Sequence, residues 1–364
     1  MKVLMISTDT TLLGQKGIGD AIKRHQQYAS RVERLDILVL SKGKQSSNQI
    51  SENCLAEPIY FLGHKKKAEE FYKKYNYDLV VCQDPFITGS LGVYLKNKFK
   101  ARLIIHFHGD FFDNEYWLKE KWQHRIYKKM AEKNIYKADS IRVVSEGIRE
   151  KLIKRGIESQ NIYKISTPVN LDQFESSVSV QQANQKIVLT VGRIVEAKDF
   201  PTLIKAAELI YKQTPEFKLK IIGDGPLLKK FKNQTRKQFY VEWLGRIDHQ
   251  DLAKYYQEAS LTVMSSDNES FGKVFLEAAM SKKPSVATDT VGAREIIKDG
   301  ESGYIVPIKD YKRLAERVVY LLNNPEITQQ MGERAYEIVR QRFGWQKNID
   351  LIISMWKQTV GGRV

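Results

Sequence analysis

Short, apolar, β-branched runs alternate with amphipathic segments along the sequence, and this alternation constrains the fold more than any other feature. In the first half we predict strands at Val3–Ile6, Leu35–Leu40, Leu79–Cys82, Leu103–His106 and Ser140–Val144. Strand-like runs separated by helical segments are typical of a parallel sheet with helical crossovers. The first half is therefore expected to be an α/β domain.

The same pattern restarts after a polar stretch at residues 175–186. Its predicted strands are Ile187–Val191, Leu219–Ile222, Tyr240–Leu244, Leu261–Ser265 and Pro284–Ala287. A chain of 364 residues suits two such domains, and we expect doubly wound, Rossmann-like domains at residues 1–172 and 173–344. Ligands of open parallel sheets bind at the carboxyl ends of the strands, so functional residues are expected in a cleft between two facing domains.

The charge of the chain restricts its partners. There are 59 basic and 43 acidic residues, a net charge of +16, and residues 1–170 hold 30 of the basic and 19 of the acidic ones. Such an excess favours nucleic acid, anionic lipid or pyrophosphate. No stretch reaches the roughly 18 apolar residues of a membrane span, the start does not resemble a signal peptide, and Cys54 and Cys82 are far apart. We expect a soluble, cytoplasmic protein.

The strongest local motif lies at residues 267–279, where a turn joins a predicted strand to a helix. Gly272 lets the backbone approach a ligand, and the free amides of the first helical turn can bind a pyrophosphate. Glu269 lies in the turn and Glu277 about two helical turns further on, near the same side. Two such carboxylates can accept hydrogen bonds from sugar hydroxyls. Alternatively, Glu269 only caps the helix and Glu277 lies on its solvated face.

A second motif, residues 191–199, follows the strand Ile187–Val191. Arg193 comes after a glycine at the end of the strand, and Lys198 lies five residues on, where a helix is expected to start. Two cations in these places can hold a pair of phosphates. In so basic a chain they are alternatively two exposed side chains.

Two weaker motifs follow later strands. Gly225 lies in a sharp turn after Leu219–Ile222, and Leu244 and Arg246 lie at the end of the next strand, where backbone groups can pair with a nucleobase edge. Each motif alone is weak evidence for a ligand site.

The first half offers two further candidates. Gly17 and Gly19 follow the first strand, so backbone amides there can approach a phosphate or a sugar, although a plain turn explains them equally well. His106 and His108 share one face of a strand, and His108, at its carboxyl end, is the stronger functional candidate. A structural role is the alternative for both.

The sequence gives no sign of a metal or of a cofactor. It has no Asp-x-Asp pair and no His, Cys and carboxylate cluster with metal-ligand spacing. A diphosphate would then be neutralised by Arg193, Lys198 and helix-terminal amides.

Basic and aromatic residues alternate at residues 117–130, and lysines cluster at residues 65–67 and 96–100. Such stretches fit an anionic membrane surface. A solvated helix face is the alternative.

Taken in order, the motifs resemble those of the retaining glycosyltransferases of family 4, which have the GT-B fold of two facing Rossmann-like domains. The resemblance covers nearly the whole chain and rests on the Glu269-x7-Glu277 pair, on Val191-Gly192-Arg193 with Lys198, and on residues 223–227, 243–245 and 292–297. The chain departs from the family pattern at Ser270 and Ala293, where the family often has glycine.

The resemblance implies roles for individual residues. Glu277 would bind the ribose hydroxyls and Glu269 the transferred sugar, and the amides of Phe271 and Gly272, beside Ser270, would take the phosphates. Arg193 and Lys198 would stabilise the leaving diphosphate, whose own oxygen would deprotonate the acceptor.

Other implied roles fall on both halves of the chain. His108 would lie by the 6-hydroxyl of the sugar, and Gly17 or Gly19 would close over the donor, whose binding set also includes Gly225, Leu244 and Arg246. The final helix, residues 345–364, would cross back onto the first domain.

We therefore expect a metal-independent retaining hexosyltransferase. Its donor would be a UDP-sugar, or next a GDP-sugar, carrying a hexose or an N-acetylhexosamine, and its acceptor a glycan or a lipid-linked molecule of cell-surface polysaccharide or glycolipid synthesis. A nucleotide-sugar epimerase of the same fold is the alternative, and a basic nucleic-acid-binding protein is a remote one; we expect no nucleic acid as partner.

Overall fold

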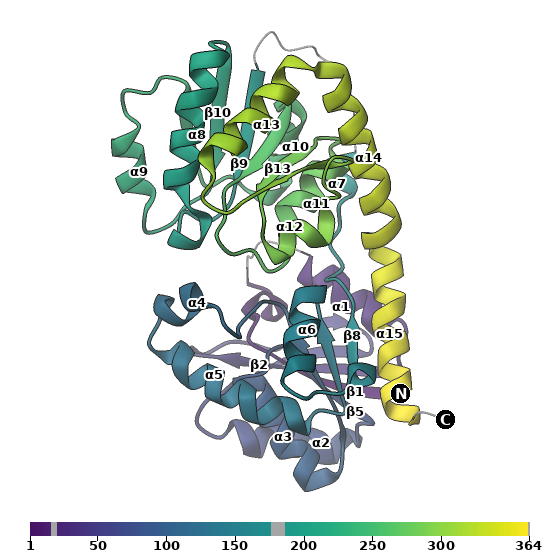
Figure 1. The fold of residues 1–364 in the computed structure, drawn as a ribbon. Coiled ribbons are helices and arrows are strands. Elements are labelled where there is room, and N and C mark those ends of the chain that lie inside the picture. The colour runs from purple at the N-terminus through teal and green to yellow at the C-terminus, as the bar shows by residue number, and fades with distance from the viewer. Residues whose placement is uncertain (16–19, 176–185, 363–364) are drawn as a thin grey trace. The chain divides into compact units, whose positions relative to one another are not determined.

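The computed structural model describes residues 1–15, 20–175 and 186–362, which form two compact units (Figure 1). Unit 1 comprises Met1–Val169 and the returning segment from Trp345 to the end, and unit 2 comprises Asn170–Gly344. Within the described ranges, no helix is long and apolar enough to cross a bilayer.

Unit 1 is built on an eight-stranded sheet in the order β3-β4-β2-β1-β5-β6-β7-β8, in which every pair is parallel except β3 with β4. The strands are β1 Lys2–Ser7, β2 Arg34–Ser41, β3 Asn48–Ser51, β4 Cys54–Tyr60, β5 Leu79–Cys82, β6 Arg102–Phe107, β7 Ser140–Val143 and β8 Ile162–Lys164. The runs predicted from the sequence form β1, β2, β5, β6 and β7, because apolar runs covered by helices on both faces are most stable as inner parallel strands.

Helices cover both faces of this sheet. They are α1 Ala21–Ala29, α2 His64–Tyr75, α3 Ile87–Phe99, α4 Glu115–Glu120, α5 Gln123–Asn134, α6 Glu146–Lys154 and α15 Trp345–Gly361, with the 3-10 turns η1 Thr10–Leu13, η2 Ile135–Lys137 and η3 Ser159–Asn161. The apolar side of α15 lies in the same core as α1, where Trp356 is fully buried and its ring centroid is 5.3 Å from that of Tyr28.

Unit 2 repeats the architecture with a six-stranded parallel sheet in the order β11-β10-β9-β12-β13-β14. The strands are β9 Lys186–Val191, β10 Phe217–Ile222, β11 Val241–Gly245, β12 Leu261–Met264, β13 Ser285–Thr288 and β14 Gly303–Val306. This is the strand order of a Rossmann fold, in which the chain reverses direction across the sheet between β9 and β12.

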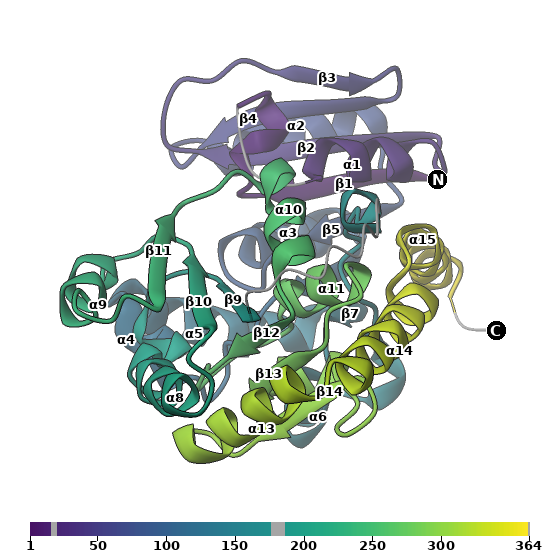
Figure 2. The same cartoon turned by 90° about the horizontal axis from the view of Figure 1, so that it is seen from above.

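The helices of unit 2 also lie on both faces of its sheet (Figure 2). They are α7 Asp172–Glu175, α8 Phe200–Gln213, α9 Leu228–Gln234, α10 Leu252–Glu258, α11 Lys273–Met280, α12 Val291–Ile296, α13 Tyr311–Asn323 and α14 Pro325–Phe343, with the 3-10 turns η4 Glu196–Lys198 and η5 His249–Asp251. Apolar side chains of α8 and α13 share a core cluster with the strands.

The boundary between the units lies earlier than the sequence predicted. The predicted first domain ended at residue 172, whereas α7 and the two residues before it belong to unit 2. Phe174, which the prediction already assigned to the second domain, is buried, and its ring packs edge-on against those of His249 and Tyr256.

Candidate functional site

Lys198 and Glu269 meet at the point of unit 2 where the strand order reverses. Lys198 ends η4, which follows β9, and Glu269 lies in the loop that follows β12; their side chains form an ion pair and each is 18% exposed. This is the place in a doubly wound sheet where ligands bind. The sequence placed the two residues in separate motifs, and the fold brings them together.

Backbone contacts hold the two loops in this arrangement. The hydroxyl of Ser265 donates to the carbonyl oxygens of Lys198 and Asp199, both at 2.9 Å, and the amide of Asp267 donates to the carbonyl of Ala197 at 2.9 Å. Since these bonds link the segments on either side of the pair, the positions of Lys198 and Glu269 do not depend on their own attraction.

Glycines are required where the Glu269 loop meets its neighbours. Gly272 begins α11 with a φ of 75°, a left-handed conformation that favours glycine. The amide of Gly292 donates to the carbonyl of Glu269 at 2.7 Å, and a Cβ on Gly292 would lie 2.8 Å from the carbonyl carbon of Phe271. Ser270 is half-buried and Phe271 is buried, with its ring 5.9 Å from that of Phe343. These contacts therefore fix the position of the loop that precedes the first turn of α11.

Glu277 is only 4% exposed, so its placement on a solvated helix face is excluded. The hydroxyl of Tyr256 donates to its Oε2 at 2.8 Å, and Nε2 of His249 lies 3.2 Å from its Oε1. Nε2 of Gln173 lies 2.9 Å from Nδ1 of His249 and donates to the carbonyl of His249 at 3.1 Å. Burial, followed by the charge of Glu277, raises the pKa of Tyr256 well above its usual value, so this phenol stays a donor.

The residues that hold Glu277 were missed by the sequence reading. Tyr256 lies in α10, His249 in η5 and Gln173 in α7, and no motif contains them. A tyrosine and a histidine at helical positions give no local signal, because only the fold shows that they share a carboxylate.

The Arg193 loop and the Gly225 loop are bound to each other. The amide of Ile194 donates to the carbonyl of Asp224 at 2.9 Å, and a Cβ on Gly225 would lie 2.5 Å from the carbonyl oxygen of Ile194. Arg193 itself is exposed in the loop between β9 and η4. The close approach explains why a glycine is needed at position 225.

Leu244 and Arg246 lie furthest from the pair within the sheet. Leu244 is half-buried in β11, the edge strand next to β10, and Arg246 is exposed just beyond it. Two strands, β10 and β9, separate them from β12.

In unit 1, His108 directly follows β6 and is exposed. Its Nε2 lies 2.8 Å from Oε1 of Gln83, which follows β5, and its Nδ1 lies 3.4 Å from the hydroxyl of Thr167. His106 is buried, consistent with a structural role for that member of the pair. The other candidates of unit 1, Gly17 and Gly19, lie outside the described residues.

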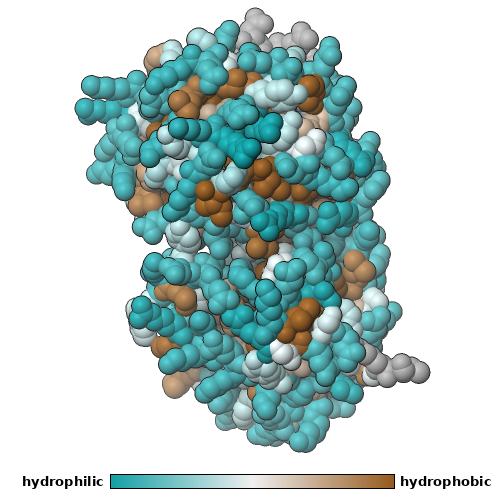
Figure 3. Space-filling view, in the orientation of Figure 1, coloured by the Kyte–Doolittle hydropathy of each residue, from teal (hydrophilic) through white to brown (hydrophobic). Residues whose placement is uncertain are grey.

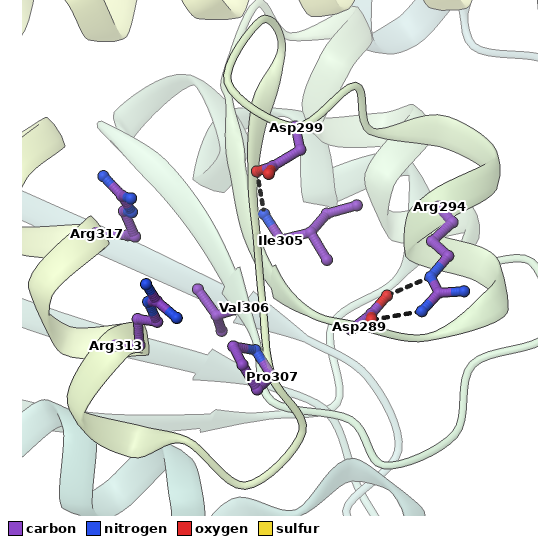
Figure 4. A pocket seen from close by; sticks show the side chains of 8 residues that line it. All are labelled: Asp289, Arg294, Asp299, Ile305, Val306, Pro307, Arg313 and Arg317. Atoms are coloured by element: carbon purple, nitrogen blue, oxygen red, sulfur yellow. Dashed lines mark hydrogen bonds and ion pairs between the residues drawn. The ribbon is translucent and has the colours of Figure 1, made fainter.

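A pocket of about 470 Å³ in unit 2 contains none of the predicted site residues (Figure 4). Several of its charged side chains have partners in the protein: Arg294 binds Asp289 through two nitrogens, Asp299 accepts the amide of Ile305 at 2.8 Å, and the guanidinium of Arg317 lies 4.7 Å from the ring of Tyr304. Arg313 also lines the pocket.

Both halves of the chain are similar to known proteins. The chain matches the description Glycosyltransferase Family 4 over residues 50–173 and Glycosyl transferases group 1 over residues 172–338. It is 29% identical to an uncharacterized glycosyltransferase of Methanocaldococcus jannaschii, over 79% of this chain and 77% of that one. It is 25% identical to the alpha-monoglucosyldiacylglycerol synthase of Streptococcus pneumoniae, over 79% and 70% of the two chains.

A solved structure extends the likeness to the whole fold. The chain superimposes on HepE of Anabaena, crystallised in complex with UDP, with a TM-score of 0.80 and 18% identity, over 98% of this chain and 100% of that one. The two proteins share their fold.

Proposed function

We propose, because the chain belongs to the glycosyl transferases group 1 family and has the GT-B fold, that it transfers a hexose or an N-acetylhexosamine with retention of anomeric configuration. UDP-sugars are the favoured donors and GDP-sugars the next, since HepE, which shares the fold, was crystallised with UDP. The observation that carries the proposal is the Lys198–Glu269 pair at the reversal point of unit 2, followed in the chain by the buried Glu277 of α11.

The donor would be held by opposite charges in fixed places. Lys198, with Arg193 and the amides at the start of α11, supports a role in neutralising the leaving diphosphate, while the carboxylates of Glu269 and Glu277 accept hydroxyls of the sugar and of the ribose. Lys198 and Glu269 form an ion pair with each other. A donor with a diphosphate and a sugar hydroxyl offers each of them a new partner.

We assign to this donor site a reaction without metal or cofactor. Within residues 1–15, 20–175 and 186–362, no cluster of three or more His, Cys, Asp and Glu side chains is arranged to hold a metal ion. Two cations and helix-terminal amides supply positive charge where the diphosphate leaves, and an oxygen of that diphosphate would take the proton of the acceptor hydroxyl. His108 is assigned to the 6-hydroxyl of the transferred sugar.

The acceptor is proposed to be a glycan or a lipid-linked molecule, used in cell-surface polysaccharide or glycolipid synthesis. The name of the pneumococcal relative, a diacylglycerol glucosylating enzyme, supports a lipid. We also propose that the protein acts in the cytoplasm, peripherally on an anionic membrane.

The exposed side of α5 in unit 1 supports the membrane proposal. Trp122 is 71% exposed and Ile126 49% exposed, one helical turn apart. Arg125 and Lys129 are exposed at positions that continue the same side of the helix, and Lys121 is exposed just before it. On the face shown in Figure 3, which has the orientation of Figure 1, apolar side chains form separate patches among polar ones. An aromatic and aliphatic pair flanked by three cations suits the headgroup region of a bilayer.

A transfer assay with a panel of UDP- and GDP-sugars tests the proposal. We expect acceptor-dependent transfer that persists in EDTA, with a product of the same anomeric configuration as the donor by NMR coupling. Release of free epimerised sugar without an acceptor would identify an epimerase instead. The absence of both transfer and donor hydrolysis across the panel would refute the proposed function.

A further inference from the structure

Unit 1 contains a buried guanidinium that is held by neutral groups. Arg142 is 2% exposed, lies on β7 directly beside His106 of β6, and forms no ion pair with any carboxylate in the described part of the chain. Its Nε donates to the carbonyl of Ile165 at 3.0 Å, its Nη1 to Nδ1 of His106 at 3.4 Å and its Nη2 to the hydroxyl of Thr167 at 3.3 Å. A buried charge is stable only when its hydrogen bonds are made, so these acceptors fix its position.

The chemistry of arginine sets the direction of these bonds. A guanidinium has donors and no acceptor, so Nδ1 of His106 must be the bare nitrogen of a neutral ring. Burial, followed by the charge of Arg142, lowers the pKa of His106 well below its usual value, which agrees with a neutral ring. The oxygen of Thr167 likewise accepts from Arg142, which leaves the hydroxyl proton of Thr167 for Nδ1 of His108 at 3.4 Å.

The second ring nitrogen of His108, Nε2, indicates the same direction of hydrogen-bond donation. Its Nε2 lies 2.8 Å from Oε1 of Gln83, and an amide oxygen can only accept, so the proton is on Nε2. Nε2 of Gln83 donates to the sulfur of Met5 at 2.9 Å, and turning the amide over would place two acceptors against each other. Hydrogen bonds therefore run one way, from Arg142 through Thr167 and His108 to Gln83.

We infer that Arg142 and Thr167 are positioning residues that fix His108 as the neutral tautomer with its proton on Nε2. The consequence for transfer rests on the function proposed above: a sugar hydroxyl that takes the place of the Gln83 oxygen at Nε2 of His108 meets an N–H donor whose tautomer is set before the donor substrate binds. Arg142 acts on His108 through Thr167, whose oxygen lies 3.3 Å from Nη2 of Arg142 and 3.4 Å from Nδ1 of His108.

The tautomer is measured by long-range ¹H–¹⁵N NMR correlation on the full-length protein labelled at its histidines, at a pH where the ring is neutral. His108→Gln identifies the signals of His108 by their loss. We expect the wild-type Nδ1 resonance at the position of an unprotonated nitrogen and Nε2 at that of a protonated one. The reverse assignment, or an average of the two, would overturn the inference without any variant.

Three substitutions then test the role of Thr167. Thr167→Val keeps the shape of the side chain and removes the hydroxyl, and we expect the His108 signals to move towards the average of both tautomers. Thr167→Ser restores a hydroxyl and should restore the wild-type spectrum. Ser166→Ala, at the neighbouring position, is the matched control and should leave the spectrum unchanged. His108 signals that do not move in a folded Thr167→Val protein would refute the role of Thr167.

Turnover provides the functional readout. We expect it to fall about tenfold in Thr167→Val and to recover in Thr167→Ser, a loss comparable to that caused by removing the supporting partner of a metal-bound histidine. Normal turnover in Thr167→Val, with the tautomer disturbed, would overturn the consequence for transfer. If the wild-type protein transferred no sugar yet showed the expected tautomer, the proposed function would fail while the positioning of His108 would stand.

Discussion

The two units share a run of parallel strands in the same order but carry different side chains at the carboxyl ends of those strands. In unit 2, the oppositely charged side chains of Lys198 and Glu269 touch each other between loops joined by hydrogen bonds to backbone carbonyls. In unit 1, a histidine, a glutamine and a threonine backed by the buried Arg142 follow the strands. Unit 2 thus has an ion pair where unit 1 has a chain of hydrogen bonds.

The largest effect is expected when the positive charge of Lys198 is removed from unit 2. Lys198→Ala should lower turnover by about 10²–10³, because a cation that stabilises a developing negative charge is lost. The fold should survive, since the pair is partly exposed and such pairs contribute little to stability. Steady-state kinetics with the identified donor, alongside circular dichroism, measure both effects.

Lys229→Ala is the matched control for that variant, because Lys229 is exposed in α9 and lies outside the site. It should retain wild-type turnover. Turnover of Lys198→Ala within about threefold of the wild type would show that charge handling is not the task of this pair.

A second test concerns His25, a buried histidine of unit 1 whose ring stays neutral. Burial lowers the pKa of His25 from 6.5 to about 4. Between these values the unfolded chain binds a proton that the folded ring does not, so the free energy of unfolding falls as the pH drops from about 6.5 to 4, by about 3 kcal/mol for this residue. Urea unfolding of a Trp243→Phe protein, whose remaining tryptophans all belong to unit 1, measures the slope.

His25→Leu should flatten that slope, although His106, whose pKa is also lowered, will leave part of it. His64→Gln is the control, because His64 is only half-buried in α2 and should not change the slope. An unchanged slope in His25→Leu would mean that His25 is not kept neutral by the fold.

A third test concerns Tyr256, whose hydroxyl donates to the buried carboxylate of Glu277. Tyr256→Phe removes the donor at 2.8 Å and leaves a buried carboxylate with one bond fewer, a loss of about 1.5 kcal/mol. The KM for the donor should then rise about tenfold with little change in turnover. Tyr255→Phe, at the neighbouring position on α10, should have no such effect, and equal KM values for both variants would contradict the assigned contact.

The smallest expected effect concerns the surface of unit 1. Lys121→Gln should weaken binding to anionic vesicles about fivefold, since each lysine near such a surface contributes about 1 kcal/mol. Lys230→Gln, an exposed lysine of unit 2, is the control. Flotation with phosphatidylserine vesicles at low salt measures both, and failure of the wild-type protein to bind would discard the membrane proposal.

The sequence predicted the strands with continuous apolar runs and missed those without them. The run Leu79–Cys82 coincides with β5, in which four apolar residues in a row are buried. β4, which lies between β3 and β2, was missed because it contains Glu57 and Pro58. The edge strands β8 and β14 were missed because β8 has only three residues and β14 begins at Gly303. At an edge, pairing on one side is enough, so a continuous apolar run is not required.

The candidate site divides in a similar way. Lys198, Glu269 and Glu277 were proposed from the sequence because each lies in a motif next to a strand end. Tyr256 and Arg142 were not, since their partners lie far away in the sequence, and neither tyrosine in a helix nor arginine in a strand is unusual. The sequence suggested candidate side chains for a ligand, whereas the fold was needed to show what holds them.

The return of α15 to unit 1 affects the order in which the chain can be built. Unit 2 is one continuous stretch, whereas the core of unit 1 is incomplete until Trp356 has been synthesised. During translation, unit 2 can therefore finish folding while unit 1 still exposes the apolar surface that α15 will cover. The half that is made first becomes stable last, and a ribosome that stalls near Gly344 would release a chain whose first unit is open to aggregation.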